Sequence, residues 1–92
     1  MSDTPDFLID WWQGLVPYSL PDVVCYTMVG NACICVVSDQ EILSGYLTAE
    51  VVNCGGRWKH YQANLWESLE EAMTHYIGLV AWCEGEKNSF GS

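Results

Sequence analysis

Positively charged side chains are scarce in this chain. Its 92 residues include three Lys or Arg against twelve Asp or Glu, a formal net charge of −9, and no cation precedes Arg57. Nucleic-acid phosphates and anionic membrane surfaces are bound mainly through Lys and Arg. The composition therefore argues against direct binding to nucleic acid or to a membrane. It favours a basic partner, because a negative field speeds encounter with one, although acidity also serves solubility alone.

Two further absences bear on where the protein works. No apolar run approaches the ~18–20 residues that a membrane-spanning helix needs, and no charged-then-apolar signal segment opens the chain. The cysteines are odd in number and lack the two closely spaced pairs that are typical of zinc sites. They are Cys25, Cys33, Cys35, Cys54 and Cys83. We therefore expect free thiols in a reducing cytoplasm, with no metal and no cofactor.

Apolar and aromatic side chains, in contrast, are abundant. Hydrophobic residues make up 50% of the chain, which includes five Trp and five Tyr. This content is too apolar for a disordered chain, and the length suits one domain and not two. We therefore expect a single domain over residues 1–92. Each aromatic ring that it buries removes ~150–250 Å² from water, which helps a small core.

The first predicted element is a short amphipathic helix. Thr4 is suited to cap it, Pro5 to open it, and Asp6 to lie at the positive end of its dipole. An apolar stripe recurs at helical spacing. It consists of Phe7, Leu8, Trp11, Trp12 and Leu15. Gly14 is expected to end the helix.

A hairpin is expected next. Residues 23–29 and 32–37 are nearly all apolar, and they flank Gly30-Asn31, a pair suited to a tight turn. Because both runs lack polar alternation, we expect the hairpin to be central and covered on both faces.

The following strands are less sharply marked. Residues 38–45 fit either a turn into a strand or one capped helical turn, and we favour a strand that begins by Tyr46. A fourth strand is expected over residues 57–65 after a turn at Gly55-Gly56. Its inward side chains are expected to be Tyr61, Ala63 and Leu65.

The segment SLEEAMTHYIGLVAW gives the clearest helix signal. Ser68 and Glu71 have the spacing of a capping box. The apolar stripe comprises Leu69, Ala72, Met73, Tyr76, Ile77 and Val80, and the outward side comprises Glu67, Glu70, Glu71 and His75. Gly78 weakens a helix, so we expect close packing there. Residues 84–92 are expected to form a loose, flexible polar tail.

Together these elements predict an α+β fold. It has an N-terminal helix, a three- to four-stranded antiparallel meander sheet, and a C-terminal amphipathic helix packed on the sheet. The short connections favour both helices on one face of that sheet.

One stretch offers catalytic chemistry. Cys54 adjoins Gly55 and Gly56, whose backbone amides could approach an oxyanion, and His60 on the adjoining strand could act as a base. However, a Gly-Gly hairpin turn needs no catalytic explanation, and no nucleophile motif surrounds Cys54. We therefore expect no enzymatic activity and no catalytic residue.

The acidic side chains are the preferred candidate site. Asp6 and Asp10 lie on the first helix, and Glu67, Glu70 and Glu71 crowd the start of the last. If both helices cover one sheet face, these carboxylates form two neighbouring rows. Such rows can pair with the Arg and Lys rows that normally hold phosphates, and the absence of nearby cations preserves the field.

In acidity, size and expected architecture the chain resembles phage-encoded inhibitors such as anti-CRISPR and anti-restriction proteins. The resemblance implies a protein that blocks a nucleic-acid channel, in the host cell cytoplasm if the chain is phage-encoded. We therefore predict a non-enzymatic inhibitor that occupies a basic, nucleic-acid-binding surface of a protein partner, with Trp11 or Trp12 as an aromatic anchor. The alternative is a structural or regulatory homo-oligomer, for example a homodimer, whose acids serve solubility only.

Overall fold

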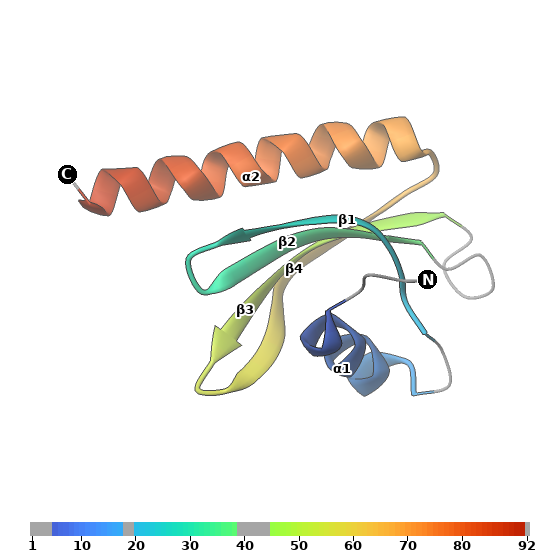
Figure 1. Cartoon of the computed structure of the whole chain (residues 1–92). Helices are drawn as coiled ribbons and strands as arrows, with labels where there is room; N and C mark the ends of the chain where they lie inside the picture. The colour runs from blue at the N-terminus through green and yellow to red at the C-terminus, as the bar shows by residue number, and fades with distance from the viewer. Residues whose placement is uncertain (1–4, 18–19, 39–44, 92) are drawn as a thin grey trace.

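The fold is α+β, as predicted. The structure, a computed structural model, describes residues 5–17, 20–38 and 45–91. Its elements are α1 (Asp6–Leu15), β1 (Asp22–Val29), β2 (Ala32–Ser38), β3 (Tyr46–Cys54), β4 (Arg57–Trp66) and α2 (Leu69–Gly91) (Figure 1). The four strands form one antiparallel sheet in the order β1-β2-β3-β4. The preferred start of the third strand at Tyr46 is confirmed, whereas residues 39–44 lie outside the described part of the chain.

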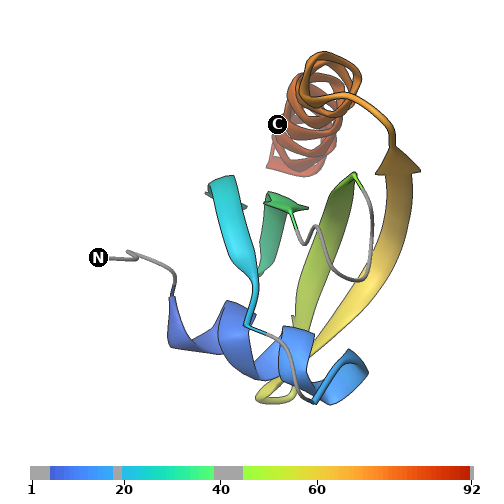
Figure 2. The same cartoon turned by 90° about the vertical axis from the view of Figure 1, so that its right-hand side faces the viewer.

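The sheet lies between the two helices (Figure 2). α1 covers one face with Leu8, Trp11 and Trp12. α2 covers the opposite face, over Ile34 and Val36 of β2. The expectation that both helices share one face is therefore wrong. The reason is that β2 presents apolar side chains on both of its faces, so each face needs a helix of its own.

The predicted hairpin is covered unequally. All seven residues of β2 are buried. β1, in contrast, lies at the edge of the sheet and alternates between exposed and half-buried residues. The prediction of a hairpin covered on both faces is confirmed for β2 and wrong for β1. The reason is that α1 packs on the β4 side of its face and leaves most of β1 uncovered there.

β4 forms the other edge, and its pairing with β3 is irregular. The register shifts between Glu50 and Val51, so that Tyr61 is the extra residue of a β-bulge. Tyr61 and Leu65 are 69% and 62% exposed, and Ala63 is also exposed. The prediction that these three side chains point inward is wrong. Short α1 covers only the Arg57 end of this strand, where Phe7 stacks on Trp58 with ring centroids 4.3 Å apart.

The predicted end of α1 also needs correction. Gly14 lies inside the helix, whose last turn closes when the backbone N–H of Val16 donates to the carbonyl oxygen of Trp12 at 2.8 Å. Leu15, which was expected in the apolar stripe, is 51% exposed. Thr4, the expected cap, lies outside the described residues.

The capping box at the start of α2 is confirmed. The backbone N–H of Glu71 donates to Ser68 Oγ at 3.2 Å, and the Ser68 hydroxyl donates to Glu71 Oε1 at 3.1 Å. The expected apolar stripe is only partly buried, because Ile77 is 62% exposed and Leu79 takes its place against the sheet. Leu79 lies three residues after buried Tyr76, on the same side of the helix, whereas Ile77 is turned away from it.

α2 is longer than the sequence suggested. It continues to Gly91, through the residues for which a loose polar tail was expected. No Pro interrupts residues 84–91, and Gly85 weakens a helix by only about 1 kcal/mol relative to Ala, so neither prevents the helix from continuing. Within the described ranges, neither helix combines the length and the apolar character that crossing a membrane requires.

Two glycines have opposite surroundings. A Cβ atom at Gly45 would lie 2.5 Å from the carbonyl oxygen of Trp66, whereas a Cβ at Gly78 meets no atom within 4 Å. The expectation of close packing at Gly78 is therefore wrong. Gly45, in contrast, permits the close approach of two backbone segments where β3 begins and β4 ends.

We predict opposite effects for the same substitution at these positions. Gly45→Ala should destabilise the protein by about 1–3 kcal/mol, because the backbone must move to relieve the clash. Gly78→Ala should stabilise it by up to about 1 kcal/mol, because Ala favours a helix more than Gly does. Urea unfolding of the two variants measures both effects. Wild-type stability of Gly45→Ala would contradict the close approach at Trp66.

Candidate functional site

The predicted acidic residues do not form one array. Asp6, Asp10, Glu67, Glu70 and Glu71 are all exposed, as expected for solvated carboxylates. However, they divide between two helices that lie on opposite faces of the sheet. The idea of two neighbouring rows of carboxylates is therefore wrong, because it depended on both helices covering the same face. Two separate acidic surfaces remain.

The α1 surface includes a cation. Asp6 and Asp10 line a cleft between α1 and the start of β4, to which Arg57 also contributes. Because the Arg57 guanidinium shares this cleft, its positive charge reduces the negative field of both carboxylates. This surface therefore lacks the property that made the acidic residues a candidate site, namely a field of one sign.

The proposed aromatic anchors on α1 belong to the core. Trp11 and Trp12 are 6% and 2% exposed, and both pack against β2 and β3. Trp12 offers no surface to a partner in this structure, and Trp11 contributes only a small part of its ring to the cleft beside Asp6, Asp10 and Arg57. The reason is that α1 is only ten residues long, so its large rings are needed to cover one face of the sheet.

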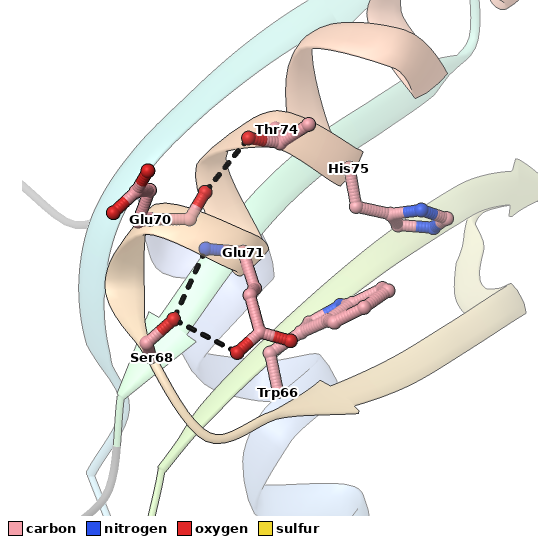
Figure 3. Close-up of a pocket in the computed structure, with 6 residues that line it drawn as sticks. All are labelled: Trp66, Ser68, Glu70, Glu71, Thr74 and His75. Atoms are coloured by element: carbon pink, nitrogen blue, oxygen red, sulfur yellow. Dashed lines mark hydrogen bonds between the residues drawn. The ribbon is translucent and has the colours of Figure 1, made fainter.

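The α2 surface is built differently. A cleft at the start of α2 is lined by Trp66, Ser68, Glu70, Glu71, Thr74 and His75 (Figure 3). Glu71 and His75 lie four residues apart, and Figure 3 shows both directed to the side on which Trp66 lies, whereas Glu70 is directed away. Glu67 precedes the helix and is exposed. The cleft thus combines the Glu71 carboxylate with an aromatic wall formed by Trp66 and His75, and Glu67 and Glu70 add negative charge beside it.

Hydrogen bonds hold that aromatic wall in place. The indole N–H of Trp66 donates to Thr48 Oγ1 at 3.0 Å, and the Trp66 and His75 ring centroids are 4.9 Å apart. Asn64 Nδ2 and His75 Nε2 are hydrogen-bonded at 3.2 Å. His75 was expected on the outward side of the helix, but it is half-buried because it packs on Trp66. The wall is therefore preorganised before any partner arrives.

Charge is segregated along the molecule. Arg57 and Lys59 lie at the start of β4, whereas α2 begins beyond its other end (Figure 1). At ~3.3 Å per residue, about 30 Å of strand separates Arg57 from Glu67. Lys87 lies about 27 Å along α2 from its first residue at 1.5 Å per residue. These separations exceed the Debye length of ~8–10 Å, so the cations barely weaken the field at the start of α2.

Such a cleft suits a cationic side chain. A guanidinium is attracted both to carboxylates and to the face of an indole ring. The sequence pointed to Glu67, Glu70 and Glu71 but not to Trp66 and His75. A local signal did exist, since Trp66 lies two residues before the capping Ser68. That His75 would meet it could not be seen, because the contact depends on how α2 crosses β4.

The suggested Cys54 and His60 pair is not assembled. His60 is paired with Val51 and shares its face of the sheet. Cys54 lies three residues after Val51 on the same strand, so it points to the opposite face. Cys54 is exposed. In the described ranges there is no group of three His, Cys, Asp or Glu side chains placed to hold a metal ion.

Comparison with known proteins identifies no relative. Neither protein families, nor curated proteins, nor solved structures gave a match to this chain.

Two thiols lie in the core beneath α1. Cys33 and Cys35 lie two residues apart on the same face of β2, and both are fully buried. Burial raises the pKa of Cys33 from its ordinary value of 9.0 to about 12, and burial raises the pKa of Cys35 as well. At a pH between 9.0 and about 12, the Cys33 thiol loses its proton in the unfolded chain but keeps it in the folded chain. The unfolded state then binds fewer protons, so stability falls as pH rises above 9.0.

We predict that alkaline pH destabilises the protein through these thiols. The free energy of unfolding should fall by up to about 1.4 kcal/mol per buried thiol between about pH 8 and about pH 10. Urea unfolding across this range measures the slope. The double variant Cys33→Ala/Cys35→Ala should lose less stability than the wild type over the same pH range, whatever its free energy of unfolding at neutral pH. Equal slopes in both proteins would contradict the prediction.

Proposed function

We propose that this protein is a non-enzymatic binding protein that places the start of α2 against a basic surface of a protein partner. One observation supports the proposal above the others. Three exposed carboxylates, Glu67, Glu70 and Glu71, gather where α2 begins, about 30 Å along β4 from Arg57. A field of one sign at such a place attracts cations and repels acidic competitors.

The chemistry of the cleft suggests what the partner presents. Arginine is the cation that best combines stacking on an indole with hydrogen bonds to carboxylates. Arginine-rich surfaces are common where a protein holds nucleic-acid phosphates. We therefore propose that the protein inhibits its partner by covering a surface that binds nucleic acid. Several of the phage-encoded inhibitors that the chain resembles in acidity, size and architecture act in this way.

A competing explanation assigns these acids to helix stability alone. Acids in the first turn of a helix interact favourably with its dipole by about 0.3–1 kcal/mol, and Glu71 also takes part in the cap of α2. Asp6 occupies the equivalent first turn of α1. The two helices therefore provide a comparison matched in net charge, because each double variant removes one first-turn acid, Asp6 or Glu70, and one further acid, Asp10 or Glu67.

We predict that Glu67→Gln/Glu70→Gln weakens binding of a short oligo-arginine peptide by about tenfold, since each exposed ion pair contributes up to about 1 kcal/mol. Asp6→Asn/Asp10→Asn removes the same charge and should change the affinity less than about twofold. NMR titration with the peptide measures both affinities. The resonances with the largest chemical-shift changes should include the indole N–H of Trp66. Glu71 is left intact so that the capping box persists.

The outcome of this comparison is unambiguous. Equal losses in the two double variants would mean that only net charge matters, and the proposed site would be wrong. If the site is correct, the partners to examine are the proteins that the wild type captures from a cell extract and that Glu67→Gln/Glu70→Gln does not capture. Added protein should then displace nucleic acid from such a partner, and unchanged nucleic-acid binding would refute the inhibitory role.

A further inference from the structure

α2 is the outermost layer of the molecule, and its outer side is uncovered. Among the described residues, α2 packs only on the four strands, and Figure 2 shows no other helix or strand beyond it. Two large apolar side chains project from the uncovered part of the helix, Ile77 at 62% exposure and Trp82 at 48%. The solvent-facing side of a helix is usually polar. This part of α2 therefore departs from an ordinary solvated surface.

The two large side chains flank a row of small ones. Ile77 and Trp82 are five residues apart, which places them about 140° apart around the helix. The residues between them follow helical spacing and are all exposed: Thr74, Gly78, Ala81 and Gly85. A Cβ atom at Gly78 would meet no atom within 4 Å, so the space above it is open. The Thr74 hydroxyl donates to the carbonyl oxygen of Glu70 at 2.9 Å and needs no partner from outside.

Acids border this apolar stretch at both ends. Glu70 and Glu84 are exposed, and each lies seven residues, or about two turns, from Ile77 along the same line of the helix. No Asp, Glu, Lys or Arg lies between Glu71 and Glu84 in the sequence. Glu70 also lines the cleft beside Trp66. The outer side of α2 is therefore negative, then apolar, then negative, and it continues directly from the acidic cleft.

We propose that the outer side of α2 binds an amphipathic helix of the basic partner. The bound helix carries cations about four turns apart, opposite Glu70 and Glu84, and an apolar side chain between them that sits over Gly78. The cation at the Glu70 end is the one that occupies the acidic cleft. This inference rests on the proposed function, from which it takes the basic character of the partner, and it adds the secondary structure and the residue pattern of the bound segment.

Backbone chemistry selects a helix over an extended segment. The N–H and C=O groups within α2 are already paired with each other, so they offer no hydrogen bonds to an extended chain. An extended segment laid over Ile77 and Trp82 would lose the water around its own backbone groups without gaining partners for them. A helix satisfies these groups internally and presents only side chains. The absence of a side chain at Gly78 leaves room for the central side chain of that helix.

Charge selects a basic helix over a second copy of this chain. An antiparallel copy of α2 centred on Ile77 would place Glu70 opposite Glu84, and a parallel copy would place each acid opposite itself. Like charges face each other in both arrangements, and the two chains each carry a net charge of −9. Cations opposite the two acids turn this repulsion into attraction. A basic helix is therefore the occupant that suits both the apolar centre and the acidic ends.

A designed peptide provides the probe. It is an alanine-rich helix of about 18 residues with two arginines 14 residues apart, which is the spacing of Glu70 and Glu84, and with leucines between them on the same side. Isothermal titration calorimetry measures its dissociation constant for the wild type, Ile77→Ser, Gly78→Gln and Leu65→Ser. Leu65 is the matched control, because it is 62% exposed like Ile77 but lies on β4.

We predict that Ile77→Ser raises the dissociation constant of the peptide by about tenfold, because most of one apolar contact is lost. Gly78→Gln should raise it by at least about fivefold, because the new side chain fills the space of the peptide leucine. Glutamine favours a helix more than glycine does, so this loss does not reflect unfolding. Leu65→Ser should change the constant by less than about twofold. The helical content of the peptide, measured by circular dichroism, should rise on binding.

Each other result overturns the proposal. No binding of the peptide, unchanged affinity in Ile77→Ser and Gly78→Gln, or an equal loss in Leu65→Ser shows that this side of α2 is not the docking surface. Equal affinity for a peptide with glutamines in place of the leucines shows that charge alone is recognised. Binding without a gain in helical content indicates an extended occupant. A dimer of the protein alone that Ile77→Ser dissociates in sedimentation equilibrium identifies a second copy as the occupant.

The oligo-arginine experiment separates failure of this inference from failure of the proposed function. If Glu67→Gln/Glu70→Gln weakens oligo-arginine binding while Ile77→Ser leaves the helical peptide unaffected, the acidic cleft stands and only the helix proposal is wrong. If Glu67→Gln/Glu70→Gln has no greater effect on oligo-arginine than Asp6→Asn/Asp10→Asn, both are wrong.

Discussion

The burial of β2 on both faces is the constraint on which the rest of the structure depends. Its side chains from Ala32 to Ser38 are removed from water on both sides of the sheet. An apolar strand of this kind is stable only where separate layers cover its two faces. α1 supplies one layer and α2 the other, although a meander of short connections would also have allowed both helices on one face. A chain of 92 residues has little else with which to cover a strand.

This three-layer arrangement also determines where the charges lie. The acids of α1 and those of α2 are placed on opposite faces of the sheet, so they act as two surfaces and not as one. The β3–β4 turn brings Arg57 into the cleft beside Asp6 and Asp10. The start of α2 lies beyond the other end of β4 and keeps its negative field. Trp11 and Trp12 serve the core, and the aromatic wall of the α2 cleft is made instead by Trp66 and His75, which are both half-buried.

The candidate site could be predicted only in part. Carboxylates such as Glu67 and Glu70 are visible in the sequence because charged residues at a helix start are almost always solvated. The contact between His75 and Trp66 joins a helix to a strand and depends on the angle at which α2 crosses the sheet, which no local pattern encodes. In the same way, the outward position of Tyr61 follows from a bulge, and a bulge reverses the faces that simple alternation assigns.

From the sequence alone followed the features that neighbouring residues decide: the turn at Gly30-Asn31, the cap formed by Ser68 and Glu71, and the start of β3 at Tyr46. Turns, caps and strand alternation depend on backbone chemistry within a few residues, so they can be derived without knowledge of the rest of the chain. Only the tertiary structure decided which sheet face each helix covers, which strands form the edges, and which acids share a surface with a cation. These outcomes depend on how limited apolar cover is divided among strands distant in sequence, which is a property of the whole packed chain.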